Sequence, residues 1–276
     1  MIAGRIRGAL LALLLALAAP AAGAGEAGGS EAGSRAAALQ PPEAAAAFAK
    51  TVERELAARG ARVALVARLG RDPADMPEGV RFTHVAAWVY SAITLADGRV
   101  VNGYVAHNLY QEPEALGRST LVQDYPAEFF LGATRLRAGI LIPDPRLQAK
   151  LLAALTDGTA ARLHVPAYSV VASPYDARFQ NCTEHLLDLT IAAVYDTTDM
   201  ARIKRIARQH FEGTPIPLGG FARAFGPAFV AGLETVDHEG PIRTATFESL
   251  SAFMGKHGLA EAMLTLEGAE PPAAQP

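Results

Sequence analysis

Apolar and polar residues alternate in several stretches of the chain, and this pattern predicts β-strands. Residues 62–69 alternate in this way and are followed by a loop at residues 70–79. Residues 81–90 form a stronger strand whose two faces are both largely apolar, which indicates a central position in a sheet. A turn signal at residues 96–98 follows, and residues 99–110 return as the partner strand of a hairpin.

Apolar residues at helical spacing predict helices on both sides of these strands. The first helix begins at the prolines 41 and 42, buries a stripe of small and large apolar residues, and ends at Gly60. A second helix begins near Cys182 and continues through the apolar residues 186–195. Three further helices are predicted at residues 145–155, 199–211 and 247–257, and two further strands at 134–141 and 168–172. An additional hairpin is predicted from residues 229–236 and 242–247. The predicted loops are residues 111–132, which include one short helix, and residues 213–220.

Composition and the two ends of the chain set the domain organisation. A chain of 276 residues with 50% hydrophobic content can bury a sizeable core. We expect a flexible linker rich in Gly, Ala and Ser at residues 25–40, a single α+β domain at residues 41–267 with a C-terminal elaboration, and a disordered tail at residues 268–276.

Residues 1–24 resemble a secretory signal peptide. Arg5 and Arg7 precede an apolar run that is shorter than the roughly 20 residues needed to span a bilayer, and an A-x-A cleavage site ends at Ala24. Cleavage would remove two arginines and no acids, which changes the formal net charge from −3 to about −5. The sequence therefore predicts a periplasmic or secreted protein without a stable membrane span after cleavage, and its charge does not favour nucleic acid as a partner.

The only cysteine of the chain lies at a predicted helix start. Asn181 is a good N-cap, and Glu184 three residues later completes an approximate capping box, which places Cys182 in the first turn. A thiol at a helix N-terminus is expected to have a lowered pKa and to act as a nucleophile when an imidazole can take its proton. A lone cysteine is also a common buried residue, so a structural role stays open.

The predicted hairpin supplies the imidazole. His84 lies within an otherwise apolar strand, where both ring nitrogens need partners, and it is our candidate for the general base. The loop length of the hairpin decides which residue of the return strand orients this ring: a two- or four-residue loop favours His107, and a three-residue loop favours Asn108. We prefer His107 as the third member and keep Asn108 as the alternative.

Four further residues are candidates for the oxyanion site or the substrate pocket. The backbone N–H of Cys182 would be the first oxyanion donor, with a side chain of Gln180 or Tyr175 as the second. Arg118 and Asp124 stand beside aromatic residues and could line a cleft, although such residues more often form a salt bridge on a loop, which we favour. No cofactor is predicted, and the seven histidines show no standard metal-ligand spacing such as H-E-x-x-H.

The order of these motifs resembles a known group of enzymes. His84, His107 and the segment Asn-Cys-Thr-Glu-His at residues 181–185 are similar to the motifs of circularly permuted papain-like cysteine enzymes, which include NlpC-type and lecithin retinol acyltransferase-like proteins. The cysteine follows the first histidine, as the permutation requires. The resemblance implies a permuted papain-like fold, in which an antiparallel sheet packs against the cysteine helix, with Cys182 as nucleophile, His84 as base and His107 as third residue; His185 receives no catalytic role.

A narrower resemblance concerns the hairpin. Thr-His-Val-Ala at residues 83–86 and Val-Ala-His at residues 105–107, in an exported chain, are similar to an uncharacterised bacterial family, domain of unknown function 2145. Our first hypothesis is an exported thiol amidase, peptidase or acyl-transfer enzyme that acts on cell-envelope material such as peptidoglycan peptides or lipid acyl groups. The alternative is a non-catalytic envelope binding or interaction module on the same fold.

Overall fold

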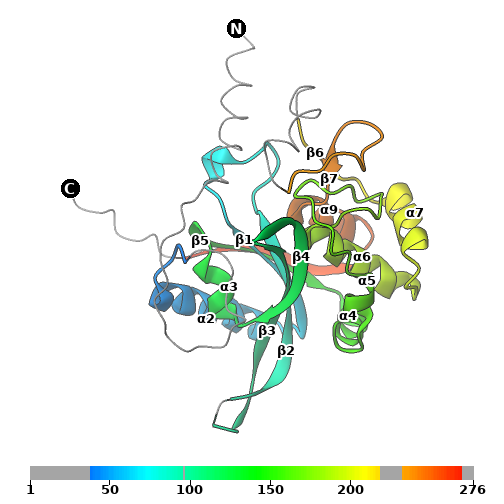
Figure 1. The fold of residues 1–276 in the computed structure, drawn as a ribbon. Helices are drawn as coiled ribbons and strands as arrows, with labels where there is room; N and C mark the ends of the chain where they lie inside the picture. The colour runs from blue at the N-terminus through cyan, green and yellow to red at the C-terminus, as the bar shows by residue number, and fades with distance from the viewer. Residues whose placement is uncertain (1–37, 96, 218–231, 269–276) are drawn as a thin grey trace, which may run out of the picture.

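The computed structural model describes residues 38–95, 97–217 and 232–268. The predicted signal peptide, nearly all of the predicted linker and all but the first residue of the predicted tail lie outside these ranges. Within them, six antiparallel strands form one sheet in the order β4-β3-β2-β1-β5-β8 (Figure 1). Their bounds are β1 Val63–Leu69, β2 His84–Thr94, β3 Val100–Glu112, β4 Ala115–Asp124, β5 Arg135–Pro143 and β8 Ala260–Glu267.

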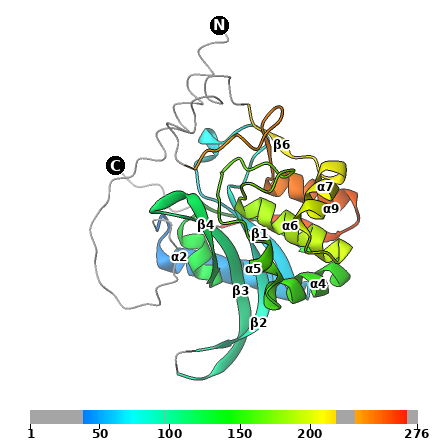
Figure 2. The same cartoon turned by 45° about the vertical axis from the view of Figure 1, so that its right-hand side comes forward.

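Helices cover both faces of this sheet (Figures 1 and 2). The helices α2 (Pro42–Ala58) and α3 (Pro126–Leu131) lie on one face, where α2 buries the predicted stripe against the sheet. The opposite face carries α4 (Pro145–Thr156), α5 (Thr159–Leu163), α6 (Cys182–Tyr195), α7 (Met200–His210) and α9 (Phe247–Lys256). The α+β class and the packing of an antiparallel sheet against the cysteine-bearing helix are thus confirmed.

Side-chain alternation divides the core between the two faces. On β2, Val85, Ala87 and Val89 pack in the cluster that includes α6, whereas Ala86 and Trp88 pack in the cluster that includes α2 and α3. A side chain on one strand is therefore assigned to a helical layer by the parity of its residue number. This rule decides below which polar residues can meet.

Several sequence predictions need correction. Residues 168–172 form no strand, because the chain turns there: Ala172 donates its N–H to the Ser169 carbonyl, and only an isolated bridge joins Tyr168 to Gln180. The predicted loop at 111–132 contains the whole of β4, and β8 was not predicted at all.

The additional hairpin is also different from its prediction. Residues 229–231 lie outside the described residues, and the described strand β7 (Arg243–Thr244) pairs with β6 (Thr214–Pro215). The loop predicted at 213–220 thus contains a short strand in its described part. A 3-10 turn, η1 (Pro73–Asp75), lies in the loop before β2.

Gly139 of β5 lies beneath a pair of aromatic rings, and this contact gives a stability prediction. A Cβ at residue 139 would approach Phe247 Cε1 to 2.6 Å and Phe82 Cε2 to 2.7 Å, and these two rings already meet edge to face. We expect Gly139→Ala to lower the free energy of unfolding by about 1–3 kcal/mol, because overpacking forces the rings apart. Urea titration measures the change, and Gly117→Ala in β4 is the matched control, since a Cβ at residue 117 would meet nothing within 4 Å. Equal effects of the two substitutions would contradict the expected clash.

Candidate functional site

Helix α6 begins as predicted at the cysteine. The Asn181 side-chain oxygen accepts a hydrogen bond from the Glu184 backbone N–H at 2.9 Å, and its amide nitrogen donates to the Thr244 hydroxyl at 2.9 Å. The N-cap is therefore confirmed. The capping box is wrong, because the Glu184 carboxylate accepts a hydrogen bond from Lys204 and does not return to the cap.

The Cys182 thiol is buried in the core cluster of α6. Burial raises the pKa of this thiol and outweighs the hydrogen bonding from the Val85 backbone and from Thr183, which favours the thiolate. The predicted lowering of the pKa by the helix N-terminus is therefore wrong for this resting state. The sulfur lies 3.9 Å from the Thr183 hydroxyl oxygen. Its proximity to the Val85 backbone places it at the same end of β2 as His84.

An amide side chain orients the imidazole of His84. His84 Nε2 lies 3.0 Å from Asn108 Oδ1, while Asn108 Nδ2 donates to the Ala106 carbonyl at 3.2 Å and to Asp124 Oδ2 at 3.3 Å. Because these two acceptors hold the amide nitrogen, the oxygen faces His84 and must accept the Nε2 proton. This tautomer leaves His84 Nδ1 with a lone pair, as a general base requires.

The His84 ring is uncharged in this setting. Burial, together with the nearby Arg68 guanidinium, lowers its pKa to about 3, although the Asn108 hydrogen bond opposes these effects. The ring stacks on Tyr110 with centroids 4.8 Å apart, and the Tyr110 hydroxyl donates to Asp124 Oδ2 at 2.7 Å. His84, Asn108, Tyr110 and Asp124 thus form one connected polar cluster on the α2/α3 face of the sheet.

The strand register places Asn108, and not His107, beside His84. Pairing of β2 with β3 sets Ala87 opposite His107 and Trp88 opposite Ala106, so even-numbered residues of the two strands share the α2/α3 face. His107 lies on the α6 face, two residues from the buried Leu109. The preference for His107 as the partner of His84 is therefore wrong, and the alternative residue occupies that position.

Cys182 and His84 approach the end of β2 from different sides. Cys182 packs in the same core cluster as Val85 and Ala87, whereas His84 faces Phe129 on the other side of the sheet, with ring centroids 5.6 Å apart. Among the described residues, no hydrogen bond joins Cys182 Sγ to a His84 ring nitrogen. Proton transfer between them requires a side-chain rotation.

Gln180 and Tyr175 make hydrogen bonds that hold the fold. Gln180 is fully buried, accepts the Val165 N–H at 2.9 Å and donates to Asp188 at 2.8 Å. The Tyr175 hydroxyl donates to the Phe211 carbonyl at 3.1 Å and accepts the Gly213 N–H at 2.9 Å. Neither side chain has a donor left for an oxyanion without breaking these contacts.

Arg118 and Asp124 lie far apart along β4, since Asp124 is its last residue and Arg118 its fourth. Arg118 is exposed, and its backbone forms an isolated bridge with Ala167. Six residues of strand, about 20 Å, separate it from Asp124. Asp124 is buried in the cluster around His84, where burial raises the pKa of its carboxyl group. The structure therefore brings Asp124, but not Arg118, to the candidate base.

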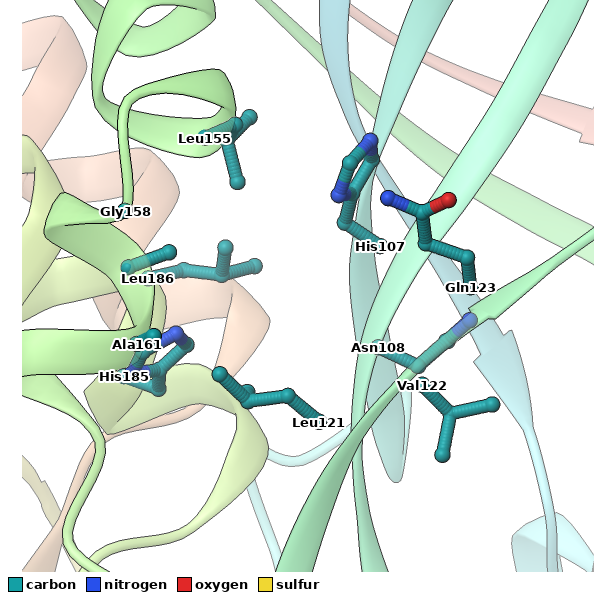
Figure 3. A pocket seen from close by; sticks show the side chains of 11 residues that line it. His107, Asn108, Leu121, Val122, Gln123, Leu155, Gly158, Ala161, His185 and Leu186 are labelled. Atoms are coloured by element: carbon teal, nitrogen blue, oxygen red, sulfur yellow. The ribbon is translucent and has the colours of Figure 1, made fainter.

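His107 lines a cavity on the α6 face instead (Figure 3). Its ring stands across this cavity from His185, which follows Cys182 by three residues on α6. Burial lowers the pKa of both rings, that of His185 to about 3. The Nδ1 atom of His185 is buried and has no hydrogen-bond partner among the described residues.

Three residues near the site were not predicted. Arg68 is buried beside the Phe129 ring and donates to the Gly132 carbonyl, and its charge acts on both His84 and Cys182. Tyr110 stacks on His84. The Tyr168 phenol lies close to Cys182, and burial together with this proximity raises the pKa of Tyr168. Of these three residues, only Arg68 gave a signal in the sequence. It is an arginine within the apolar strand pattern of residues 62–69, and a charge buried there needs a partner because burying an unpaired charge is costly.

A buried ion cluster fixes the first turns of α6. Lys204 Nζ of α7 lies 2.6 Å from Glu184 Oε1 and 2.8 Å from both carboxylate oxygens of Asp188. Burial raises the pKa of Glu184 well above its usual range, whereas the two acids raise the pKa of Lys204 against its own burial. Burial raises the pKa of Asp188 as well, so the two acids share the single positive charge of Lys204.

Neither a metal-ligand cluster nor a membrane-spanning helix is found among the described residues. They bring together no group of three or more His, Cys, Asp or Glu side chains that could hold a metal ion. Within the same ranges, each helix is too short or too polar to cross a membrane.

The lowered pKa of His185 predicts how stability depends on pH. A histidine that is neutral in the fold but protonated in the unfolded chain stabilises the fold fully above its unfolded pKa of about 6.5, and this stability is lost as pH falls toward 3. We expect His185→Leu to flatten the decline of the unfolding free energy between pH 6 and pH 4 by about 1.4 kcal/mol per pH unit. Urea titrations at several pH values test this, with the exposed His210→Leu as control. An unchanged slope in His185→Leu would contradict a buried neutral ring.

Fold and site together define the class of this protein. It is an α+β protein in which a six-stranded antiparallel sheet packs against helices, with its single cysteine buried at the start of α6. A family model described as an uncharacterized protein conserved in bacteria, domain of unknown function 2145, matches residues 55–254. This match covers more than half of the chain, so the chain belongs to that family, as the hairpin motifs predicted. Comparisons with curated proteins and with solved structures found no match.

Proposed function

We propose that this protein is an exported thiol hydrolase or acyl-transfer enzyme that acts on amide or ester bonds through Cys182, His84 and Asn108. The observation that carries the proposal is the 3.0 Å hydrogen bond from His84 Nε2 to Asn108 Oδ1, which fixes the imidazole in the tautomer that a base needs. The order of strand histidine, strand asparagine and helix-start cysteine supports a permuted papain-like arrangement. Periplasmic or secreted location, from the signal-like residues 1–24, makes cell-envelope material the substrate class.

The proposed reaction proceeds in two halves. In the proposed reacting state, reached after a side-chain rotation, His84 Nδ1 accepts the Cys182 thiol proton while Sγ bonds to the carbonyl carbon. The C–N or C–O bond of the substrate then breaks as the leaving group takes that proton. Water or another acceptor then attacks the resulting thioester and passes its proton to His84. The C–S bond breaks, and the released Cys182 thiolate takes this proton to regenerate the thiol. Asp124 acts as a positioning residue, because it holds the Asn108 amide in the orientation that directs Oδ1 to His84.

A second candidate, a non-catalytic envelope binding module, is favoured by one observation. The thiol is 7% exposed, its pKa is raised by burial, and in the described residues no hydrogen bond connects it with His84. These are properties of a packed core cysteine.

Alkylation of the thiol separates the two candidates. Because the chain has one cysteine, iodoacetamide labelling followed by mass spectrometry reports on Cys182 alone. We expect the rate at pH 7 to fall at least about tenfold in His84→Ala and in Asn108→Ala, since a buried thiol reacts slowly without a base. His210→Ala, at the exposed end of α7, is the control and should react like the natural protein. Equal rates in all four proteins would favour the binding module.

A further inference from the structure

The cavity that His107 lines lies between the sheet and the helices α4, α5 and α6, of which α6 carries the cysteine. Its volume is about 200 Å³. Leu121, His107 and Gln123 form the strand wall, and Leu155, His185 and Leu186 form the helix wall (Figure 3). Asn108, which orients His84, also borders it.

The position of the cavity relates it to the proposed nucleophile. His185 and Leu186 follow Cys182 by three and four residues on α6, so they lie on the same side of the helix, about one turn or 5 Å further along its axis. A group attached to a carbonyl carbon at Cys182 Sγ would have to extend about one helical turn along α6 to reach this space, because Cys182 itself does not line it. The cavity thus lies where the acyl part of a substrate would continue.

The lining of the cavity selects uncharged groups. Three leucines contribute apolar surface, and among the described residues that line it there is no Asp, Glu, Lys or Arg. The two imidazoles are neutral because burial lowers their pKa values. A charged group would lose its hydration without gaining a partner, which is costly.

The size and polarity of the cavity further limit which groups it can bind. A cavity of about 150 Å³ holds benzene, so a volume of about 200 Å³ fits an acyl chain of roughly four to eight carbon atoms. His107, Gln123 and His185 add polar side chains to an otherwise mainly apolar wall.

We infer that this cavity is an acyl subsite, which binds a short, uncharged acyl group of the substrate next to Cys182. The inference rests on the proposed function for its chemistry, because the acyl group is the part transferred to the thiol. Binding of an uncharged molecule to the cavity does not depend on that chemistry and can be measured separately.

The binding experiment uses hexanamide as the probe and NMR signals of the imidazoles as the readout. We expect hexanamide to shift the His107 and His185 signals of the mature protein, and hexylammonium to bind at least tenfold more weakly. Ala161→Phe at the exposed rim of the cavity should weaken hexanamide binding at least tenfold. The control Ala201→Phe, on the exposed side of α7, should leave it unchanged.

The kinetic experiment compares acetyl and hexanoyl esters. Ala161→Phe should lower kcat/KM for the hexanoyl ester at least tenfold more than for the acetyl ester. Hydrolysis that depends on Cys182, without hexanamide binding or chain-length dependence, would overturn the subsite and leave the proposed function standing. Hexanamide binding without hydrolysis of any ester would overturn the proposed function and leave an uncharged-ligand site.

Discussion

Replacing Cys182 by serine should reduce hydrolysis of ester and amide substrates at least about 10³-fold while the protein stays folded. A serine hydroxyl is close to a thiol in size but is a far poorer nucleophile beside a neutral imidazole. The melting temperature and the near-ultraviolet circular dichroism should therefore change little. A panel of p-nitrophenyl esters and peptidoglycan peptide amides provides the substrates, and the rate of product release provides the measurement.

Matched variants decide whether a loss of activity reflects chemistry. Asn108→Ala should lower kcat more than KM rises, because it frees the His84 ring without touching the thiol. His107→Ala should retain the activity on acetyl esters, because the strand register turns it away from His84. Activity that survives in Cys182→Ser would contradict a thiol enzyme and leave the binding module as the function.

The fold was predictable wherever one residue pattern dominated a segment. The strands β1, β2, β3 and β5 and the helices α2, α4, α6, α7 and α9 all follow from alternation or helical spacing. Strand β4 was missed because Gly117, Arg118 and Ser119 interrupt its apolar pattern. Strand β8 was missed although its residues alternate between half-buried and exposed; as an edge strand it has no fully buried position.

The site was less predictable, because its contacts depend on register and on tertiary packing. Identity of the third residue depended on a one-residue difference in hairpin register, which no local pattern determines. The pKa of Cys182 depended on how deeply α6 is buried, a property of the helices around it and not of its own first turn. The N-cap Asn181 was predictable because capping is local.

The burial of Lys204 also depends on tertiary packing, and it leads to a prediction about stability. The helix predicted at residues 199–211 carries mixed charges, and nothing in its sequence distinguishes Lys204, which is 5% exposed and bonded to Glu184 and Asp188. We expect Lys204→Met to lower the free energy of unfolding by about 3–5 kcal/mol, because it leaves the Asp188 carboxylate buried without its counter-ion. Urea titration at pH 7.5 provides the measurement.

Two comparisons identify the cause of this destabilisation. Lys150→Met removes an exposed ion pair with Asp196, whose side chains are 43% and 79% exposed, and should cost less than about 1 kcal/mol. Adding Asp188→Leu to Lys204→Met removes the stranded charge and should restore much of the loss. If Lys204→Met and Lys150→Met had equal effects, the buried pair would not be a source of stability.

The pH dependence of the stability lost in Lys204→Met tests whether an unpaired Asp188 carboxylate causes the loss. Without the lysine, burial raises the pKa of Asp188 further above its unfolded value, since the opposing charge is gone. A carboxyl group with a raised pKa favours the fold while it is protonated, and this contribution is lost as pH rises through the folded-state pKa. The deficit relative to the natural protein should therefore be smaller at pH 5 than at pH 8. A deficit that did not change with pH would indicate lost packing of the lysine side chain and not an unpaired carboxylate.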